Sequence, residues 1–221
     1  MKNLKLSAVR SIDLAIKELN NTGVSYQAEH FLLSRPFPKN GGGTESAVFL
    51  VRDRDEESGE ENLSLGIYFN PRTRENLKEI DKVSPLRPED LEAFAVVAEE
   101  ISHFHYMLFH LPGGRSLRKI ELELQGEVDS FLLSFFLSCE KLSLEEAFQS
   151  TFESLFEKFH LRDHLDENER SRYEYAIGFA KRFIAKLKPL LTQPEQREAL
   201  LKWTRKFYRL SFEEKLSWIK S

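Results

Sequence analysis

The chain has almost no cysteine, since Cys139 is the single cysteine among 221 residues. One thiol excludes an intrachain disulfide, so the fold has to be held together by its hydrophobic core. Eighteen phenylalanines supply bulky side chains for such a core. Cys139 itself ends the apolar run 131–139, where we expect a buried, unreactive thiol in a reducing compartment.

The chain also lacks a long uninterrupted hydrophobic run. The apolar stretch around Phe131 contains serines and is far shorter than the ~20 residues that a membrane-spanning helix needs. Near the N-terminus, Arg10, Asp13 and Lys17 interrupt the apolar residues, which argues against the apolar segment of a signal peptide. We therefore expect a soluble, cytoplasmic protein without a membrane partner.

The net charge is small, at −4, but it is unevenly distributed. From Arg170 onwards there are 13 Lys or Arg and 5 Asp or Glu, whereas residues 1–169 contain 19 basic and 31 acidic residues. Such a division is found where a basic face binds nucleic acid or a membrane surface. It is also expected where basic helices dock on the acidic part of the same chain or keep their charges in solvent, which is the interpretation we favour.

The residue pattern predicts an α+β fold: an N-terminal helix, a small antiparallel sheet, and then a helical region with a buried motif helix. Apolar residues at helical spacing predict a helix over 6–20. Strands separated by Gly- and Pro-rich or acidic connectors are expected at 24–34, 46–52 and 63–69, followed by a short helix at 74–80.

After Pro88 the whole pattern is helical. The first long helix is expected to run to about His110, and the second from Ser116 as its N-cap to about Cys139. Ser143 and Glu146 have the spacing of a capping box, and two or three further helices follow. We expect residues 1–140 to form the α+β core and residues 141–221 to form a helical region packed on it within one domain.

The first long helix contains the most informative stretch, Glu99-Glu100-Ile101-Ser102-His103. Glu99 and His103 are four residues apart, so their side chains point the same way from the helix. A helical wheel places Tyr106 and His110 on the same stripe and Glu100 at its edge, while apolar residues cover most of the remaining surface. Buried acids and histidines are costly unless they pair or bind a metal ion.

The second long helix offers the partner carboxylates. Glu123 and Glu127 are also four residues apart, and Glu127 shares its face with apolar residues, so we expect it to point inward. The small residues Gly126, Ser130 and Ser134 allow close approach of the neighbouring helix. Glu99, His103 and Glu127 can therefore converge, and one imidazole with two carboxylates suits zinc, iron or manganese.

The stretch 99–103 resembles the His-Glu-x-x-His helix motif of zinc peptidases, with Glu in place of the first His. In the gluzincin branch a Glu on a later helix is the third ligand, and Glu127, 24 residues after His103, occupies a similar position. The order of small sheet, motif helix and ligand helix is also similar to a zincin core over residues 24–140.

This resemblance implies that Glu99, His103 and Glu127 bind a divalent metal ion, with zinc as the first choice and iron or manganese as alternatives. It also implies that Glu100 is the general base in hydrolysis of a peptide or amide bond. Further supporting or alternative ligands are Glu123, Tyr106 and His110. Because Glu replaces the first His, the same resemblance also describes an inactive derivative, which would hold no metal if the motif is degenerate.

Other interpretations stay open on the sequence alone. Glu100-x-x-His103 and Glu157-x-x-His160 have the spacing of ferritin-like di-iron proteins. The acids and the histidine could also be ordinary pairs on solvated helix faces. A non-catalytic interaction module is the main alternative function, with a protein partner or nucleic acid bound by the basic C-terminal helices, where aromatic and basic residues alternate over 203–209.

Overall fold

The computed structural model describes residues 7–35, 46–54, 61–82, 88–158 and 166–220. Its helices and strands, in chain order, are α1 (Ala8–Asn20), β1 (Ala47–Arg54), β2 (Glu61–Tyr68), α2 (Pro71–Lys82), α3 (Pro88–His110), α4 (Lys119–Ser138), α5 (Leu144–Phe152), α6 (Glu167–Leu191), α7 (Arg197–Arg209) and α8 (Phe212–Lys220). This order confirms the predicted fold class, an N-terminal helix and a small antiparallel sheet followed by a mainly helical region.

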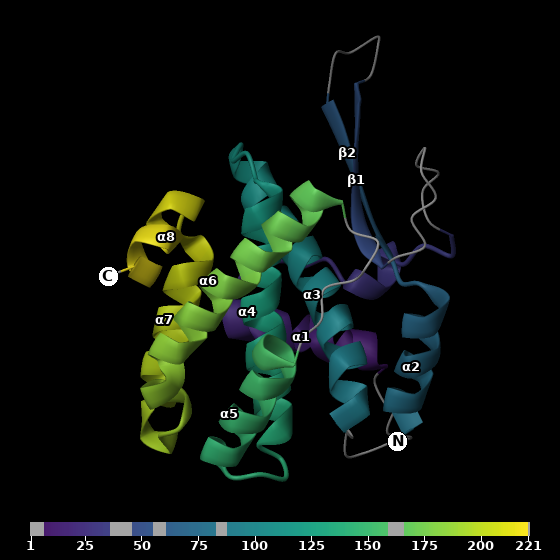
Figure 1. Cartoon of the computed structure of the whole chain (residues 1–221). Coiled ribbons are helices and arrows are strands. Elements are labelled where there is room, and N and C mark those ends of the chain that lie inside the picture. The colour runs from purple at the N-terminus through teal and green to yellow at the C-terminus, as the bar shows by residue number, and fades with distance from the viewer. Residues whose placement is uncertain (1–6, 36–45, 55–60, 83–87, 159–165, 221) are drawn as a thin grey trace.

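The sheet is a two-stranded ribbon that projects from one side of the helices, above α2 (Figure 1). β1 and β2 pair antiparallel, with Ala47 opposite Tyr68 and Arg54 opposite Glu61. α7 and α8 lie on the opposite side of the molecule (Figure 1). α3 packs along α4, and α4 in turn packs against α6, so α4 is enclosed by two long helices.

The strand predicted at 24–34 is wrong. This segment contains a 3-10 turn, Ala28–Phe31, and joins the sheet through a single bridge between Leu32 and Ile67. The backbone N–H of Ala28 donates to the buried carboxylate of Asp13 at 3.1 Å. Because a side chain of α1 holds this amide, it cannot take part in a strand ladder, and the chain turns instead.

The second long helix begins later than predicted, at Lys119 rather than at Ser116. α3 is followed by a 3-10 turn, Leu111–Gly113, which closes at Gly114 in the left-handed region with φ of +74°. Arg115 then donates to Glu121 and to the backbone oxygen of Leu210. These bonds hold the chain extended up to Arg118, so the helix starts only beyond it.

Two other local predictions are confirmed, and the predicted burial of Cys139 is only partly correct. Ser143 and Glu146 form the expected capping box at the start of α5, and the short helix expected near residue 74 is α2. Cys139 is half-buried rather than buried, and burial raises the pKa of its thiol. None of the described helices is long and apolar enough to cross a membrane.

The hydrophobic core surrounds α3 and α4. Buried side chains of both helices, among them Ile101, Phe104 and Phe131, belong to one continuous cluster. Phe131 also stacks on Phe156 with ring centres 5.4 Å apart, which ties α4 to the segment after α5. Phenylalanine therefore provides much of the packing that a chain without disulfides requires.

Basic residues of α7 dock on α1, which confirms part of the favoured interpretation of the charge asymmetry. Arg205 donates through Nε to the backbone oxygen of Leu19 at 3.1 Å, and Arg209 donates through Nη1 to that of Asn20 at 3.0 Å. These oxygens belong to the last turn of α1, where helix carbonyls lack internal partners and cations are favoured.

A buried carboxylate on α1 organises the N-terminal part of the fold. Asp13 accepts hydrogen bonds from Lys17 Nζ at 2.9 Å, Arg10 Nη1 at 3.1 Å and Ala28 N, and it lies 2.8 Å from Nε2 of the buried His105 on α3. Burial alone would raise the pKa of this carboxyl, but the bonds to His105, Lys17 and Ala28 outweigh burial and lower the pKa to about 2.

Replacing Asp13 with asparagine is expected to remove a pH-dependent part of the stability. The pKa of the Asp13 carboxyl is lower in the folded chain than in the unfolded chain, where it is about 4. Above about pH 4 the ionised carboxylate therefore stabilises the folded state by about 2 kcal/mol. That stabilisation is lost as the pH falls from about 4 to about 2. Urea unfolding at several pH values should show a flatter profile for Asp13→Asn than for wild type, whereas the exposed Glu18→Gln control keeps the wild-type slope. An unchanged slope in Asp13→Asn would contradict this assignment.

Candidate metal centre

Within the described part of the chain, Glu99, His103 and Glu123 form a group that could hold a metal ion. Each offers one ligand atom, and these atoms all lie within 4.8 Å of one another. Glu99 and His103 come from consecutive turns of α3, as predicted, and Glu123 comes from the facing side of α4. Nε2 of His103 lies 3.5 Å from Oε2 of Glu123, so the two helices meet at this pair.

Two of these ligand atoms are buried without a hydrogen-bond partner. They are His103 Nε2 and Glu123 Oε2, the same two atoms that face each other. Buried polar atoms are nearly always paired, and an unpaired one costs about 1–3 kcal/mol. A cation bound at this point would satisfy both atoms.

The remaining polar atoms of the two side chains are held from outside the group. Nδ1 of His103 lies 3.6 Å from Oε2 of Glu100, and Oε1 of Glu123 accepts a hydrogen bond from Nε of Arg172 on α6 at 3.3 Å. Partners of this kind fix the orientation of metal-binding side chains in known sites. Here Glu100 and Arg172 lie at the other polar atoms of the two side chains, and Nε2 and Oε2 face each other.

The absence of a side chain at Gly126 lets α4 approach the group closely. A Cβ atom built on Gly126 would lie 2.7 Å from Nε2 of His103 and 2.8 Å from Cγ of Glu99. One turn further along α4, Ser130 Oγ donates to the backbone oxygen of Ala95 at 3.0 Å. The structure thus confirms that small residues of α4 permit close helix packing at the group.

The electrostatics of the group are dominated by buried acids around one imidazole. Burial alone would lower the pKa of His103, but the carboxylates of Glu100, Glu123 and Glu99 raise it to about 10. Burial and the carboxylate of Glu127 raise the pKa of Glu99 well above its usual range. In the metal-free chain these raised pKa values favour bound protons, and a divalent cation can take the place of those protons.

Glu127 belongs to the same acidic cluster, but it is not one of the three side chains whose ligand atoms lie within 4.8 Å. Burial, together with the charge of Glu123, raises the pKa of Glu127 to about 8, and the charge of His103 opposes that shift. Sequence analysis preferred Glu127 to Glu123 as the partner of His103. The structure brings Glu123 to the imidazole and leaves Glu127 as an adjacent carboxylate.

The polar atoms of Tyr106 and His110 have partners in a second buried network. Tyr106 donates to Oε1 of Glu121 at 2.6 Å and accepts from Nζ of Lys215 at 3.0 Å. His110 Nε2 lies 3.1 Å from the backbone oxygen of Tyr208. Both residues therefore join α3 to the C-terminal helices in this structure, and neither is among the three grouped ligands.

The charged groups of the second network have hydrogen-bond partners. Lys215, which is fully buried, also donates to Oε1 of Gln125 at 2.8 Å, and Gln125 Nε2 donates to Asp129 at 3.0 Å. Asp129 also accepts from Ser102 and Asn20. Burial lowers the pKa of Lys215 to about 7, although the charges of Glu121 and Asp129 oppose that shift. These residues form a polar core that links α1, α3, α4 and α8.

Sequence analysis missed two residues of α6 that reach the metal centre. Arg172 contacts Glu123, and burial together with the charges of Glu123, Glu99 and Glu100 raises the pKa of Tyr173. Both residues follow a highly charged segment, and no local pattern distinguishes them from solvated residues. Only the return of α6 along α4 brings them to the centre.

The ferritin-like interpretation requires a second Glu-x-x-His pair of ligands, and the described residues do not provide one. His160 lies outside them, and the carboxylate of Glu157 is exposed and pairs with Lys181 at 3.4 Å.

Comparison of the chain with protein-family models, with curated proteins and with solved structures found no match. The function therefore has to be inferred from the geometry of the centre itself.

Proposed function

We propose that this chain binds a divalent metal ion through Glu99, His103 and Glu123. The observation that carries the proposal is the pair of buried atoms without a hydrogen-bond partner, His103 Nε2 and Glu123 Oε2, that face each other at 3.5 Å. One imidazole nitrogen and two carboxylate oxygens suit zinc best, with iron and manganese as alternatives. Hydrolytic zinc sites have three protein ligands and leave the fourth position for a water molecule, and this set of three side chains fits that pattern.

We further propose that the bound ion serves hydrolysis of a peptide or amide bond, as the likeness of residues 99–103 to the zinc-peptidase motif implies. A zinc ion in such a site lowers the pKa of a bound water to near 7. The chain would contribute a buried surround that limits access of bulk water. From α6, Arg172 donates a hydrogen bond to Oε1 of Glu123 and would hold this ligand in place.

Hydrolysis is tested by incubating the zinc-loaded chain with a mixed peptide pool and following cleavage by mass spectrometry. Cleavage is expected with zinc, should disappear after treatment with a chelator, and should return when zinc is restored. If the chain binds zinc but cleaves nothing, the hydrolase part of the proposal fails and the metal-binding part stands. Cleavage that survives complete removal of the metal would contradict the hydrolase part, because the reaction would then not depend on the ion.

Substitution of Glu100 distinguishes two roles that this residue could have in the proposed site. Its contact with Nδ1 of His103 favours a role in orienting the imidazole, whereas the peptidase resemblance implies a general base. If Glu100 orients His103, Glu100→Gln should weaken zinc binding about tenfold or more, as measured by calorimetric titration. Unchanged zinc affinity with loss of cleavage would instead assign the general-base role.

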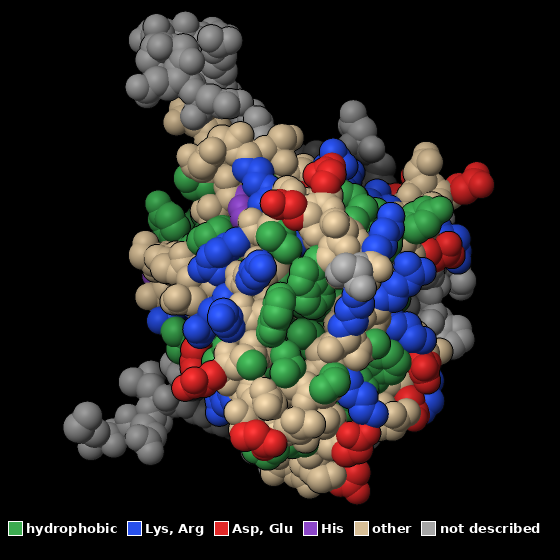
Figure 2. Space-filling model, turned by 90° about the vertical axis from the view of Figure 1, so that its left-hand side faces the viewer, with side chains coloured by type: hydrophobic (Ala, Val, Ile, Leu, Met, Phe, Trp, Pro, Cys, Tyr) green, Lys and Arg blue, Asp and Glu red, His purple; other side chains and the backbone are tan. Residues whose placement is uncertain are grey.

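A second candidate function rests on the face formed by the C-terminal helices. Figure 2 shows Lys and Arg side chains flanking a strip of hydrophobic side chains on this side of the molecule. Trp203 of α7 is 37% exposed there, and Nζ of Lys206 lies 5.3 Å from its ring centre. Single-stranded nucleic acid binds surfaces that combine basic and stacking groups. Binding of a labelled oligonucleotide should weaken steeply with salt, and absent or salt-insensitive binding removes this candidate.

A further inference from the structure

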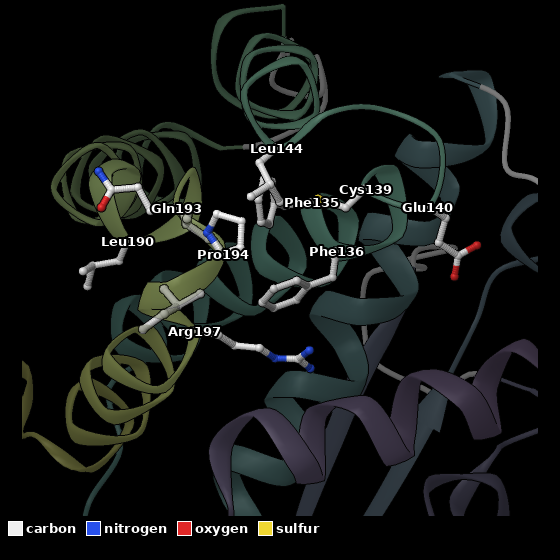
Figure 3. A pocket seen from close by; sticks show the side chains of 11 residues that line it. Phe135, Phe136, Cys139, Glu140, Leu144, Leu190, Gln193, Pro194 and Arg197 are labelled. Atoms are coloured by element: carbon white, nitrogen blue, oxygen red, sulfur yellow. The ribbon is translucent and has the colours of Figure 1, made fainter.

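A cavity of about 520 Å³ lies between the C-terminal end of α4, the start of α5, and the connection from α6 to α7 (Figure 3). Its volume falls within the range of about 300–1,000 Å³ that is typical of small-molecule sites. Its wall is mainly apolar and includes Phe135, Phe136, Leu144, Leu190, Leu191 and Leu200. None of the residues of the candidate metal centre lines it.

The cavity has one cation in its wall, Arg197, in the first turn of α7. None of the ion pairs or hydrogen bonds among the described residues uses the Arg197 side chain, so its guanidinium is free to bind a ligand. In the view of Figure 3 the Arg197 side chain is drawn below that of Phe136. The acid in the wall, Glu140, directs its carboxylate away from the apolar side chains (Figure 3).

These features together define one kind of ligand. An apolar wall takes up a hydrocarbon body, because its transfer from water to the cavity is favourable in proportion to the apolar area buried. A guanidinium without an internal partner binds a carboxylate through two parallel hydrogen bonds. We propose that this cavity binds an amphiphile of the fatty-acid class, with its chain among the phenylalanines and leucines and its carboxylate on Arg197.

Cys139 makes the proposal directly measurable. It lines the cavity and is the single cysteine of the chain, so a thiol reagent reports on this place alone. The probe ligand is dodecanoate, used below the concentration at which it forms micelles. At about ten times its dissociation constant, dodecanoate should slow the reaction of Cys139 with a neutral disulfide reagent about tenfold by mass action. No protection at any concentration would overturn the proposal.

The contribution of Arg197 is tested with matched variants and ligands. Arg197→Gln should weaken dodecanoate binding about tenfold. Arg182→Gln, which removes the same charge from α6 outside the cavity, should leave it unchanged. Dodecanol, with the same chain and no charge, should bind wild type more weakly than dodecanoate does. Equal binding of dodecanol and dodecanoate, or equal effects of the two arginine substitutions, would overturn the assignment of the carboxylate to Arg197.

Discussion

Replacing His103 with alanine is expected to lower the affinity of the chain for zinc by more than about 100-fold, beyond the usual effect of losing a group that merely orients a ligand. His103 supplies the single nitrogen among the three grouped ligands, and its Nε2 is one of the two buried atoms without a partner. The affinity is measured by calorimetric titration of metal-free protein with zinc.

The matched control is His30→Ala, which removes an exposed histidine outside the centre. It should leave the zinc affinity at the wild-type value, because an exposed imidazole remote from the acidic cluster contributes no ligand. Glu123→Gln serves as a second variant that keeps the shape of the side chain, in case His103→Ala does not fold. If His103→Ala and Glu123→Gln both fold and bind zinc like wild type, the proposed ligand set is wrong.

Substituting Gly126 with alanine is expected to destabilise the fold and to disrupt the centre together. The added Cβ would lie 2.7 Å from Nε2 of His103 and 2.8 Å from Cγ of Glu99, closer than real contacts of this kind. Relief requires α4 to move away or the His103 ring to shift. Overpacking of this kind costs about 1–3 kcal/mol in the free energy of unfolding, measured by urea denaturation, and zinc affinity should fall with it.

Gly178 on α6 provides the matched control, since a Cβ there would meet nothing within 4 Å. Gly178→Ala should leave zinc binding unchanged and should stabilise the chain by up to about 1 kcal/mol, because alanine favours a helix over glycine. If Gly126→Ala behaved like Gly178→Ala, the close approach of α4 to His103 would be contradicted.

The α3 half of the centre could be predicted from the sequence because it depends on local geometry alone. A spacing of four residues places Glu99 and His103 on one helix face whatever surrounds the helix. The same holds for the capping box of Ser143 and Glu146, which satisfies groups within one turn. Such features need only the regular backbone of one helix.

The choice between Glu123 and Glu127 could not be made in this way. The two are one turn apart and share a face of α4, so a helical wheel does not show which of them lies opposite His103. The answer depends on the position of α4 along the axis of α3. The turn at Leu111–Gly113 and the segment up to Arg118 connect the two helices, and the predicted start of the second helix lies in this segment and was wrong.

Contacts between distant segments explain the other differences. The carboxylate of Asp13 accepts a hydrogen bond from the amide of Ala28, and the chain turns in a segment that was predicted as a strand. Arg172 reaches Glu123 only because α6 packs back along α4, 49 positions further along the chain. Periodicity along one element does not contain this information, since it depends on the assembly of several elements.

The most direct test of the account is elemental analysis of the purified chain after expression with zinc, iron and manganese supplied. The account predicts about one metal ion per wild-type chain, with zinc in excess of the others, and almost none in His103→Ala. Wild-type protein without metal, or equal metal in wild type and His103→Ala, would contradict the proposal that Glu99, His103 and Glu123 form a metal centre.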